Sequence, residues 1–176
     1  MAMAERIFVL TEVERAALAS HGLNPERIVV IGSGVDVEHF DHLSRRTLTT
    51  NLDLARSPAI ARIAFIGRKT KYKAIDVLID AVRRVREYQP VELVLVGPDS
   101  EWFQEHLQSL AGADRSWIRD LGVISEAEKV AVLHSSDVLV QPSPHESFGI
   151  VFLEAWACGI PVIGVVDTNH SPVGID

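Results

Sequence analysis

The chain has 176 residues, enough for one domain and part of another, and its 47% hydrophobic content predicts a sizeable core. Its formal net charge of −7 argues against a general nucleic-acid or membrane-surface binder, and no apolar run approaches the roughly 18 residues of a transmembrane segment. The single cysteine, Cys158, lies in an apolar run and is predicted to be buried, which fits a reducing cytoplasmic location.

The first 40 residues predict a strand, a helix and a second strand. The apolar runs at residues 7–10 and 28–31 are typical of short buried strands. Between them, Thr11 and Glu14 have the spacing of a capping box, so a helix is expected to continue to about Ser20 and to stop at Gly22. The polar interval 41–58 that follows is interpreted as a linker.

Residues 59–176 continue the alternation more regularly. Strands are predicted at 61–66, 91–96, 117–123, 138–140 and 160–163, and helices at 73–88, 101–111, 125–134 and 148–157. This pattern predicts an α/β fold with a doubly wound parallel sheet, whose ligands bind beyond the carboxyl ends of the strands. The loops at that edge begin at Gly67, Gly97, Gly122, Pro142 and Gly164.

The loop after the strand 61–66 carries four cations in six residues, at positions 68, 69, 71 and 73. Arg68 can bind two phosphate oxygens in bidentate fashion, and Lys73 can add a point charge at the start of the next helix. Solvated surface cations are the alternative interpretation. Because a second helix begins near residues 148–149, we expect Arg68 and Lys73 to bind phosphate, and Lys69 and Lys71 to be solvated.

Two carboxylates, Glu146 and Glu154, flank that second helix start. If most of the segment is helical, they are about 12 Å apart, which is about the reach of a nucleotide sugar. The helix N-terminus between them suits a phosphate. A carboxylate within the apolar run around Glu154 is costly to bury without partners, which favours a functional role over a solvated one. Taken alone, Glu146 lies in a predicted loop and gives weaker evidence of a functional role.

Other segments carry weaker signals. Residues 122–126 could seat a nucleotide base or form an ordinary turn with Ser125 as helix cap, and both can hold. His145 could donate to a sugar hydroxyl or be a simple loop residue. A cluster around residues 36–42 resembles metal ligands, but its spacing matches no strong site, and no metal is predicted. The sequence contains no nucleophile elbow, P-loop or G-x-G-x-x-G fingerprint.

Together these segments resemble the GT-B glycosyltransferases of family 4, also called group 1. The resemblance spans about residues 6–164, and its most specific block runs from Pro142-Ser143 through Glu146-Ser147-Phe148-Gly149 to Glu154-Ala155. The other matching segments are Val30 to Asp36, Phe65 to Arg68, Lys73, Asp76 to Ala81, Leu93 to Gly97, Leu121 to Ser125, Ser135 to Val138 and Gly159 to Ile163.

The resemblance implies a retaining transfer of a sugar from a nucleotide-sugar donor to an acceptor hydroxyl, with no metal and no cofactor. Arg68 and Lys73 would hold the donor diphosphate, and Glu146 would contact the donor sugar; these three form the implied catalytic set. Glu154 would accept hydrogen bonds from the ribose. The remaining implied donor-binding residues are Gly67, Val123, Ile124, Phe148, Gly149 and Ile150.

This chain departs from the family pattern at two places. Ala74 stands where the family usually has glycine, which alters the turn only if the position needs a positive φ. After Ile163 the family commonly has a Gly-Gly loop and a glutamate, whereas this chain continues from Gly164 with a different sequence through the segment Asp167 to His170.

The resemblance also implies a fragment of a two-domain enzyme. Residues 1–40 would be a remnant of the N-terminal acceptor domain, 41–58 the linker, and 59–176 a donor-binding domain that is incomplete at its C-terminus. The expected partners are a nucleotide-sugar donor, the missing acceptor domain and a second copy through exposed apolar surface. A peripheral membrane association is an alternative to a purely cytoplasmic location of the full-length enzyme.

Two further interpretations stay open on the sequence. One is a non-catalytic nucleotide-binding or scaffolding module on the same fold. The other is a different α/β nucleotide-binding protein such as an epimerase, against which the absence of a glycine-rich first loop argues.

Overall fold

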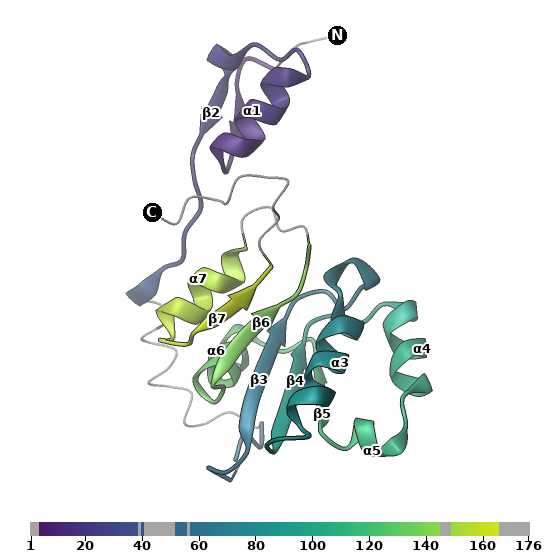
Figure 1. Ribbon diagram of the computed structural model, residues 1–176. Helices are drawn as coiled ribbons and strands as arrows, with labels where there is room; N and C mark the ends of the chain where they lie inside the picture. The colour runs from purple at the N-terminus through teal and green to yellow at the C-terminus, as the bar shows by residue number, and fades with distance from the viewer. Residues whose placement is uncertain (1–3, 39, 41–51, 56, 145–148, 166–176) are drawn as a thin grey trace.

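The computed structural model describes residues 4–38, 40, 52–55, 57–144 and 149–165 (Figure 1). An N-terminal unit pairs β1 (Ile7–Val9) with β2 (Ile28–Val30) in parallel, and a five-stranded parallel sheet follows in the order β5-β4-β3-β6-β7. Among the described residues, no helix combines the length and the apolar character that crossing a bilayer requires. The α/β class and the doubly wound parallel sheet predicted from the sequence are confirmed.

The N-terminal unit contains α1 (Glu12–Ser20) and a 3-10 turn at Pro25–Arg27. The predicted capping box is present, because Thr11 Oγ1 accepts from Glu14 N at 3.1 Å and Glu14 Oε2 accepts from Thr11 N at 3.1 Å. No residue of α1 is buried, and Phe8 of β1 is largely exposed. These exposed apolar side chains are available to contact a partner. Self-association of the chain, which the sequence predicts, stays a prediction.

The five-stranded sheet is built around β3 (Ala61–Ile66). On one side lie β4 (Val91–Val96) and β5 (Ile118–Gly122), and on the other lie β6 (Val138–Gln141) and β7 (Val162–Gly164). The helices are α3 (Ile75–Val85), α4 (Glu101–Ser109), α5 (Gly112–Arg115), α6 (Glu126–His134) and α7 (Ile150–Ala157). Each strand is joined to a parallel neighbour, so its connection must cross one face of the sheet.

Two apolar clusters cover the two faces of this sheet. Ala64 of β3 points into the cluster formed with α6 and α7, whereas its neighbour Phe65 points into the cluster formed with α3 and α4. This alternation is the period of two that a strand buried on both faces produces. Figure 1 shows the same division, with α6 and α7 on one side of the sheet and α3, α4 and α5 on the other.

The structure corrects several predicted boundaries. The helix expected from residue 73 begins only at Ile75, after a 3-10 turn at Lys71–Lys73, and the unpredicted α5 follows α4. Phe40, assigned from the sequence to the N-terminal unit, is buried in the cluster of α6 and α7, because its ring finds an apolar face there. Residues 41–51 of the predicted linker lie outside the described residues.

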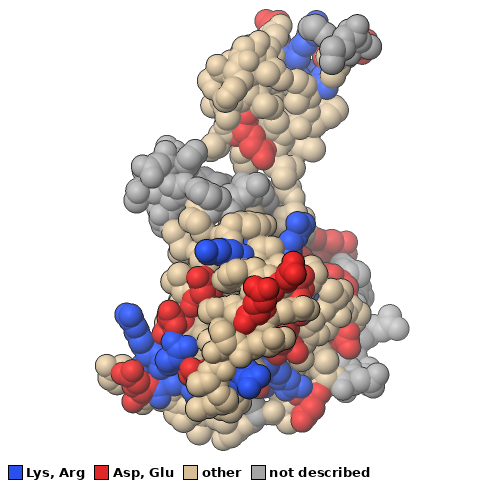
Figure 2. Space-filling view, turned by 90° about the vertical axis from the view of Figure 1, so that its right-hand side faces the viewer, with Lys and Arg blue, Asp and Glu red and all other residues tan. Residues whose placement is uncertain are grey.

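On the face that Figure 2 shows, basic and acidic side chains of the described residues lie interspersed over the sheet domain. On this face, the charges of the described residues form no extended patch of one sign.

Candidate functional site

The strand order reverses between β3 and β6, which are adjacent and parallel, with Ala64 opposite Leu139. In open α/β sheets, ligands bind at such a switch point, beyond the carboxyl ends of the strands. Gln141, almost fully buried at the end of β6, ties the two strands there, because its Nε2 donates to Ile66 O at 2.6 Å. The candidate site therefore lies between the loop 67–74 and the loop that follows Gln141.

The two helices that follow these strands begin in the same unusual way. The residue before α3 is Ala74 with φ 52° and ψ 39°, and the residue before α7 is Gly149 with φ 67° and ψ 46°. Both are left-handed, and among the described residues no side chain caps either helix. The first N–H groups of an α-helix have no intrahelical acceptor, so two helix starts at one switch point can bind an anion together.

Left-handed geometry has different consequences at the two positions. An ideal Cβ on Gly149 would lie 2.6 Å from Phe152 Cδ2, so this glycine is required by space as well as by its φ angle. Ala74 carries a Cβ in a conformation that L-residues disfavour. The position does need a positive φ, so the departure from glycine noted in the sequence is structurally significant.

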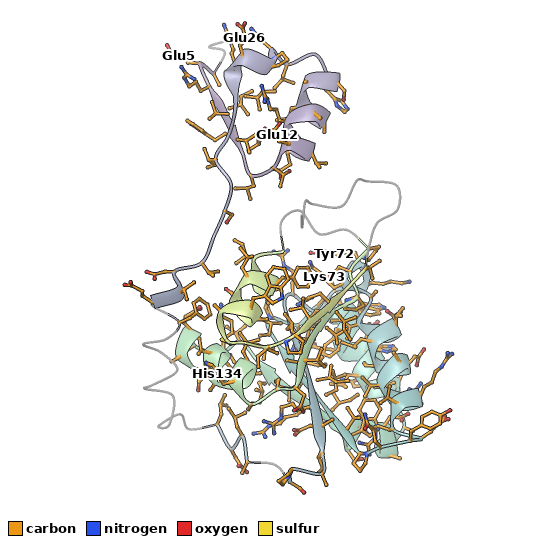
Figure 3. The ribbon with its side chains drawn as sticks, turned by 60° about the vertical axis from the view of Figure 1, so that its left-hand side comes forward. Glu5, Glu12, Glu26, Tyr72, Lys73 and His134 are labelled. Atoms are coloured by element: carbon orange, nitrogen blue, oxygen red, sulfur yellow. The ribbon has the colours of Figure 1, made fainter. Side chains whose placement is uncertain are left out.

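The proposed phosphate-binding cations occupy the first of these loops. Arg68 is exposed, and Lys73 is half-buried with its Nζ 5.2 Å from the ring centroid of Tyr72. Figure 3 places Tyr72 and Lys73 at the carboxyl end of the sheet and His134 toward the opposite end. The prediction that Arg68 and Lys73 share the loop at this edge is confirmed, whereas phosphate binding stays a prediction.

Lys69 contradicts the sequence prediction of a solvated side chain. It is fully buried and pairs with Asp99 and Asp120, which follow β4 and lie in β5. Burial of an ammonium is tolerated because two carboxylates share its charge. Lys71, by contrast, is exposed as expected.

Two hydroxyls add polar groups to the switch-point loops. Thr70 Oγ1 and Ser143 Oγ are buried, and neither has a hydrogen-bond partner in the part of the chain that the structure describes. A buried polar group without a partner costs free energy, so each such group calls for an explanation. A ligand bound between the two loops would supply partners for both.

Glu154 lies on α7 in the apolar setting that the sequence indicates, and its side chain is 12% exposed. Its Oε1 accepts from Lys129 Nζ of α6 at 2.7 Å, and Glu126 Oε1 lies 2.9 Å from the same ammonium. Burial, the largest effect, lowers the pKa of Lys129, but hydrogen bonds to Glu154 and Glu126 outweigh it, and the net pKa is raised. Lys129 therefore stays charged at neutral pH.

Sequence reasoning missed Lys129. The signal that could have found it is a single cation on a helix whose next four residues are apolar, in the segment Lys129-Val130-Ala131-Val132-Leu133. A cation at that place needs an anion from a neighbouring element, and Glu154 is a carboxylate that the sequence already marks as needing a partner.

The loop after β5 combines exposed and packed apolar groups. Val123 is 75% exposed, whereas Ile124 packs against the cluster of α6 and α7. The capping box of α6 is confirmed, with Glu128 N donating to Ser125 Oγ at 3.3 Å and Ser125 N donating to Glu128 Oε2 at 2.8 Å. The interpretation as a capped turn is confirmed, whereas binding of a base at Val123 and Ile124 stays a prediction.

Several predicted residues lie outside the described part of the chain. These are Glu146, Phe148 and His145, the segment Asp167 to His170, and His39, Asp41 and His42 of the cluster that resembled metal ligands. Among the residues that the structure describes, no group of three or more His, Cys, Asp or Glu side chains could hold a metal ion.

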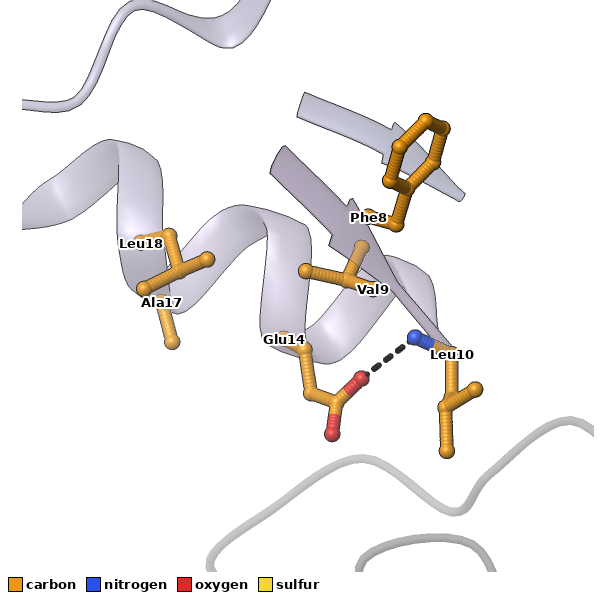
Figure 4. Close-up of a pocket in the computed structure, with 6 residues that line it drawn as sticks. All are labelled: Phe8, Val9, Leu10, Glu14, Ala17 and Leu18. Carbon is orange, nitrogen blue, oxygen red and sulfur yellow. Dashed lines mark hydrogen bonds between the residues drawn. The ribbon is translucent and has the colours of Figure 1, made fainter. Parts of the chain in front are cut away.

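The N-terminal unit contains a hollow of its own between β1 and α1 (Figure 4). In it, Leu10 N donates to Glu14 Oε2 at 2.7 Å. Its lining residues are Phe8, Val9, Leu10, Glu14, Ala17 and Leu18. None of the residues singled out from the sequence as donor ligands lines this hollow, so the site at the switch point is the stronger candidate.

The geometry defines a class of protein: a Rossmann-like α/β domain with two left-handed helix starts at its switch point. Comparison with known proteins gives the family. The chain matches the model of the glycosyl transferases group 1 over residues 60–172, and it belongs to this family.

The curated relatives agree with this assignment. The D-inositol 3-phosphate glycosyltransferase of Mycobacterium sp. (strain KMS) is 34% identical over 165 residues, and that of Mycolicibacterium gilvum (strain PYR-GCK) is 36% identical over 167 residues. Each match covers 91% of this chain but only 37% and 36% of the relative, so the chain spans little more than a third of their length.

Solved structures share the fold. Anabaena Alr3699/HepE, solved in complex with UDP and glucose, gives a TM-score of 0.71 at 22% identity, covering 92% of this chain and 44% of that chain. WaaG, a glycosyltransferase involved in lipopolysaccharide biosynthesis, gives 0.68 at 20% identity over 90% and 44% of the two chains. These likenesses support a GT-B glycosyltransferase fold, of which this chain forms a part.

Proposed function

We propose that this chain forms the donor-binding part of a retaining glycosyltransferase, which moves a sugar from a nucleoside diphosphate sugar to an acceptor hydroxyl. One observation carries the proposal: two uncapped helices, α3 and α7, start from left-handed residues beside the adjacent strands β3 and β6. A diphosphate bound there would accept hydrogen bonds from the N–H groups at both helix starts. It would also form ion pairs with Arg68 and Lys73.

The proposed chemistry follows from where negative charge develops. The bond between the anomeric carbon and the diphosphate oxygen breaks, and the leaving diphosphate keeps the electron pair. The acceptor oxygen forms the new glycosidic bond on the same face of the sugar, and its proton passes to the leaving diphosphate oxygen. Arg68, Lys73 and the N–H groups at 148–150 would stabilise the charge on the leaving group, in the manner of an oxyanion hole. Because these cations provide the charge, the proposal requires no metal and no cofactor.

The other proposed contacts orient the donor. Glu146 would bind hydroxyls of the transferred sugar, and Glu154 would accept from the ribose. Val123 and Ile124 would line the base. The buried hydroxyls of Thr70 and Ser143 would gain ligand partners in the same loops, which supports a ligand at this edge.

Relatives suggest which ligand to test first. Anabaena Alr3699/HepE, which shares the fold, was solved in complex with UDP and glucose, so UDP comes first among the nucleotides, with GDP and ADP beside it. The curated relatives are named for D-inositol 3-phosphate, but this chain spans about 37% of the length of the first of them. Our proposal therefore takes from them only the transfer of a glycosyl group and leaves the acceptor open.

The proposal is tested by calorimetric titration of the chain with UDP, GDP and ADP. We expect one of them to bind, and Arg68→Ala to weaken that binding about tenfold or more, since a hydrogen bond to a charged group contributes about 1.5–3 kcal/mol. Lys71→Ala is the matched control, because it removes an exposed cation from the same loop. If the folded chain binds none of the three, or if both variants bind equally well, a scaffolding module on this fold becomes the better explanation.

A further inference from the structure

Lys69 directly follows the proposed phosphate ligand Arg68, yet its side chain turns away from solvent and is fully buried. Its Nζ lies 2.5 Å from Asp99 Oδ1, contacts Asp120 Oδ1, and stands 5.1 Å from the ring centroid of Phe103. Asp99 follows β4 and Asp120 lies in β5, so one ammonium joins the loop after β3 to two further strands of the sheet.

The backbone of Lys69 is held at the same place. Lys69 N donates to Pro98 O at 2.9 Å, and Lys69 O accepts from Ser100 Oγ at 2.6 Å and from Ser100 N at 3.3 Å. These bonds extend the pairing of β3 with β4 past the strand ends. The backbone of Arg68, one residue earlier, is positioned by them, which matters because the exposed Arg68 side chain has little packing of its own.

Asp120 carries the connection onward to the loop assigned to the base. Its Oδ1 also accepts from Gly122 N at 3.0 Å. The register of β4 with β5 shifts here, so Val96 faces Gly122 rather than Leu121. Such irregularities often redirect a strand end next to a functional site. Through Asp120, the ammonium of Lys69 is thus linked to the start of the loop 122–125.

We propose that Lys69 is a positioning residue that fixes the spacing between the diphosphate subsite at Arg68 and the base subsite at Val123 and Ile124. This inference rests on the donor-binding function proposed above. Stability alone does not explain the arrangement, because well-packed apolar side chains of similar volume often stabilise a protein as well as a buried ion network does. The ion pairs and directed hydrogen bonds of Lys69 hold the loops after β3, β4 and β5 in one geometry. Apolar packing would fix that geometry less specifically.

The test separates positioning from stability with two variants. Lys69→Met leaves Asp99 and Asp120 without their cation, and we expect its Tm to fall by about 10 °C. Lys69→Met/Asp120→Leu replaces the ion pair of Lys69 and Asp120 with apolar groups. We expect this double variant to recover most of the Tm that the single variant loses. Calorimetry with the nucleoside diphosphate that the unmodified chain binds should still give an affinity about tenfold weaker for the double variant, as loss of supporting contacts commonly does.

A matched control exists at the other end of the same strand. Arg62 is also fully buried, and its Nε lies 2.7 Å from Glu92 Oε2 of β4. Arg62→Met/Glu92→Leu therefore removes an equally buried ion pair far from the strand ends that form the site. We expect it to change Tm without changing nucleotide affinity. Inorganic pyrophosphate, which has no base, should lose less affinity in the Lys69 double variant than the nucleotide does.

The possible results are distinct. The inference is overturned if the Lys69 double variant binds the nucleotide as tightly as the unmodified chain, if the Arg62 control loses as much affinity, or if pyrophosphate and nucleotide lose affinity equally. Failure of the unmodified chain to bind any nucleoside diphosphate would instead overturn the proposed function, and the inference with it. Weakened nucleotide binding in a double variant of restored Tm supports the positioning role.

Discussion

Lys129 Nζ of α6 lies 2.7 Å from Glu154 Oε1 of α7, so the carboxylate assigned to the donor ribose is held by a cation from the neighbouring helix. Both side chains are mostly buried, at 16% and 12% exposure. Because the ammonium contacts Oε1, we expect Oε2 to accept the ribose hydroxyls. The pair therefore both satisfies a costly buried charge and orients it toward the ligand.

Replacing Lys129 tests this double role. We expect Lys129→Met to lower the free energy of unfolding by about 1–2 kcal/mol, between the values typical of exposed and of buried pairs, and to weaken nucleotide binding. Urea denaturation and calorimetric titration measure the two effects. The control is Glu126→Gln, which removes only the partner that is 49% exposed and should cost less than about 1 kcal/mol. An equal loss in both variants would contradict the assignment.

A substitution at Ala74, the left-handed residue before α3, is expected to stabilise the protein. We expect Ala74→Gly to raise the free energy of unfolding by about 1 kcal/mol, because it relieves a Cβ held at φ 52°. The matched control is Ala81→Gly on the exposed side of the same helix, which should cost about 1 kcal/mol through lost helix propensity. Urea denaturation measures both. Destabilisation by Ala74→Gly would mean that the left-handed geometry is not adopted in solution.

Much of this fold could be predicted from the sequence because its signals are local. The apolar run of β3 predicts its bounds directly, and both capping boxes, at Thr11 and at Ser125, follow from a three-residue spacing. The start of α3 was missed because nothing in the local pattern reveals that Ala74 is left-handed. The apolar periodicity begins only at Ile75 and does not fix the conformation of the residue before it, and a left-handed conformation is not expected of alanine.

The site was less predictable because its contacts are long-range. Lys69 and Lys71 look alike in the sequence, but only Lys69 meets Asp99 and Asp120, the latter 51 residues away along the chain. The partner of Glu154 is likewise set by how α6 packs beside α7, which no spacing in the sequence encodes. Charge runs are usually solvated, and this general tendency gave the wrong answer for Lys69, which the sheet brings between Asp99 and Asp120.

The capping box beside the proposed base loop should make stability depend on acid pH. Hydrogen bonds from the Ser125 side chain and backbone lower the pKa of Glu128 below its ordinary 4.5. The folded protein then holds the ionised form more strongly than the unfolded chain does. The stabilisation is therefore present above pH 4.5 and lost as the pH falls through the lowered pKa.

Glu128→Gln is the variant that tests this dependence. We expect its urea midpoint to lie below that of the unmodified chain at about pH 7, and the difference to disappear as the pH falls below the lowered pKa of Glu128. Glu126→Gln, in the same first turn but without the bond to Ser125, should leave this pH dependence in place. A difference that persists unchanged into acid would show that the carboxylate charge is not involved.

Cys158, the single thiol of the chain, reports on burial beside Glu154. Burial raises its pKa to about 11, with a further increase from the Glu154 charge and a partly compensating decrease from Lys129. At about pH 8 the folded chain should therefore react slowly with iodoacetamide, and unfolding in urea should restore ordinary thiol reactivity. In Lys129→Met, loss of the compensating cation should slow the folded-state reaction further, because the pKa rises.

The same shift predicts an alkaline loss of stability. The unfolded thiol releases its proton near its ordinary pKa of 9.0, whereas the folded thiol retains it until about 11, so the stabilisation present at neutral pH declines between these values. Other groups titrate in this range, and Cys158→Ala isolates the contribution of the thiol by difference. The unmodified chain should lose stability more steeply than Cys158→Ala between pH 9 and 11. Parallel pH profiles would mean that Glu154 and its apolar surroundings do not hold the thiol in its neutral form.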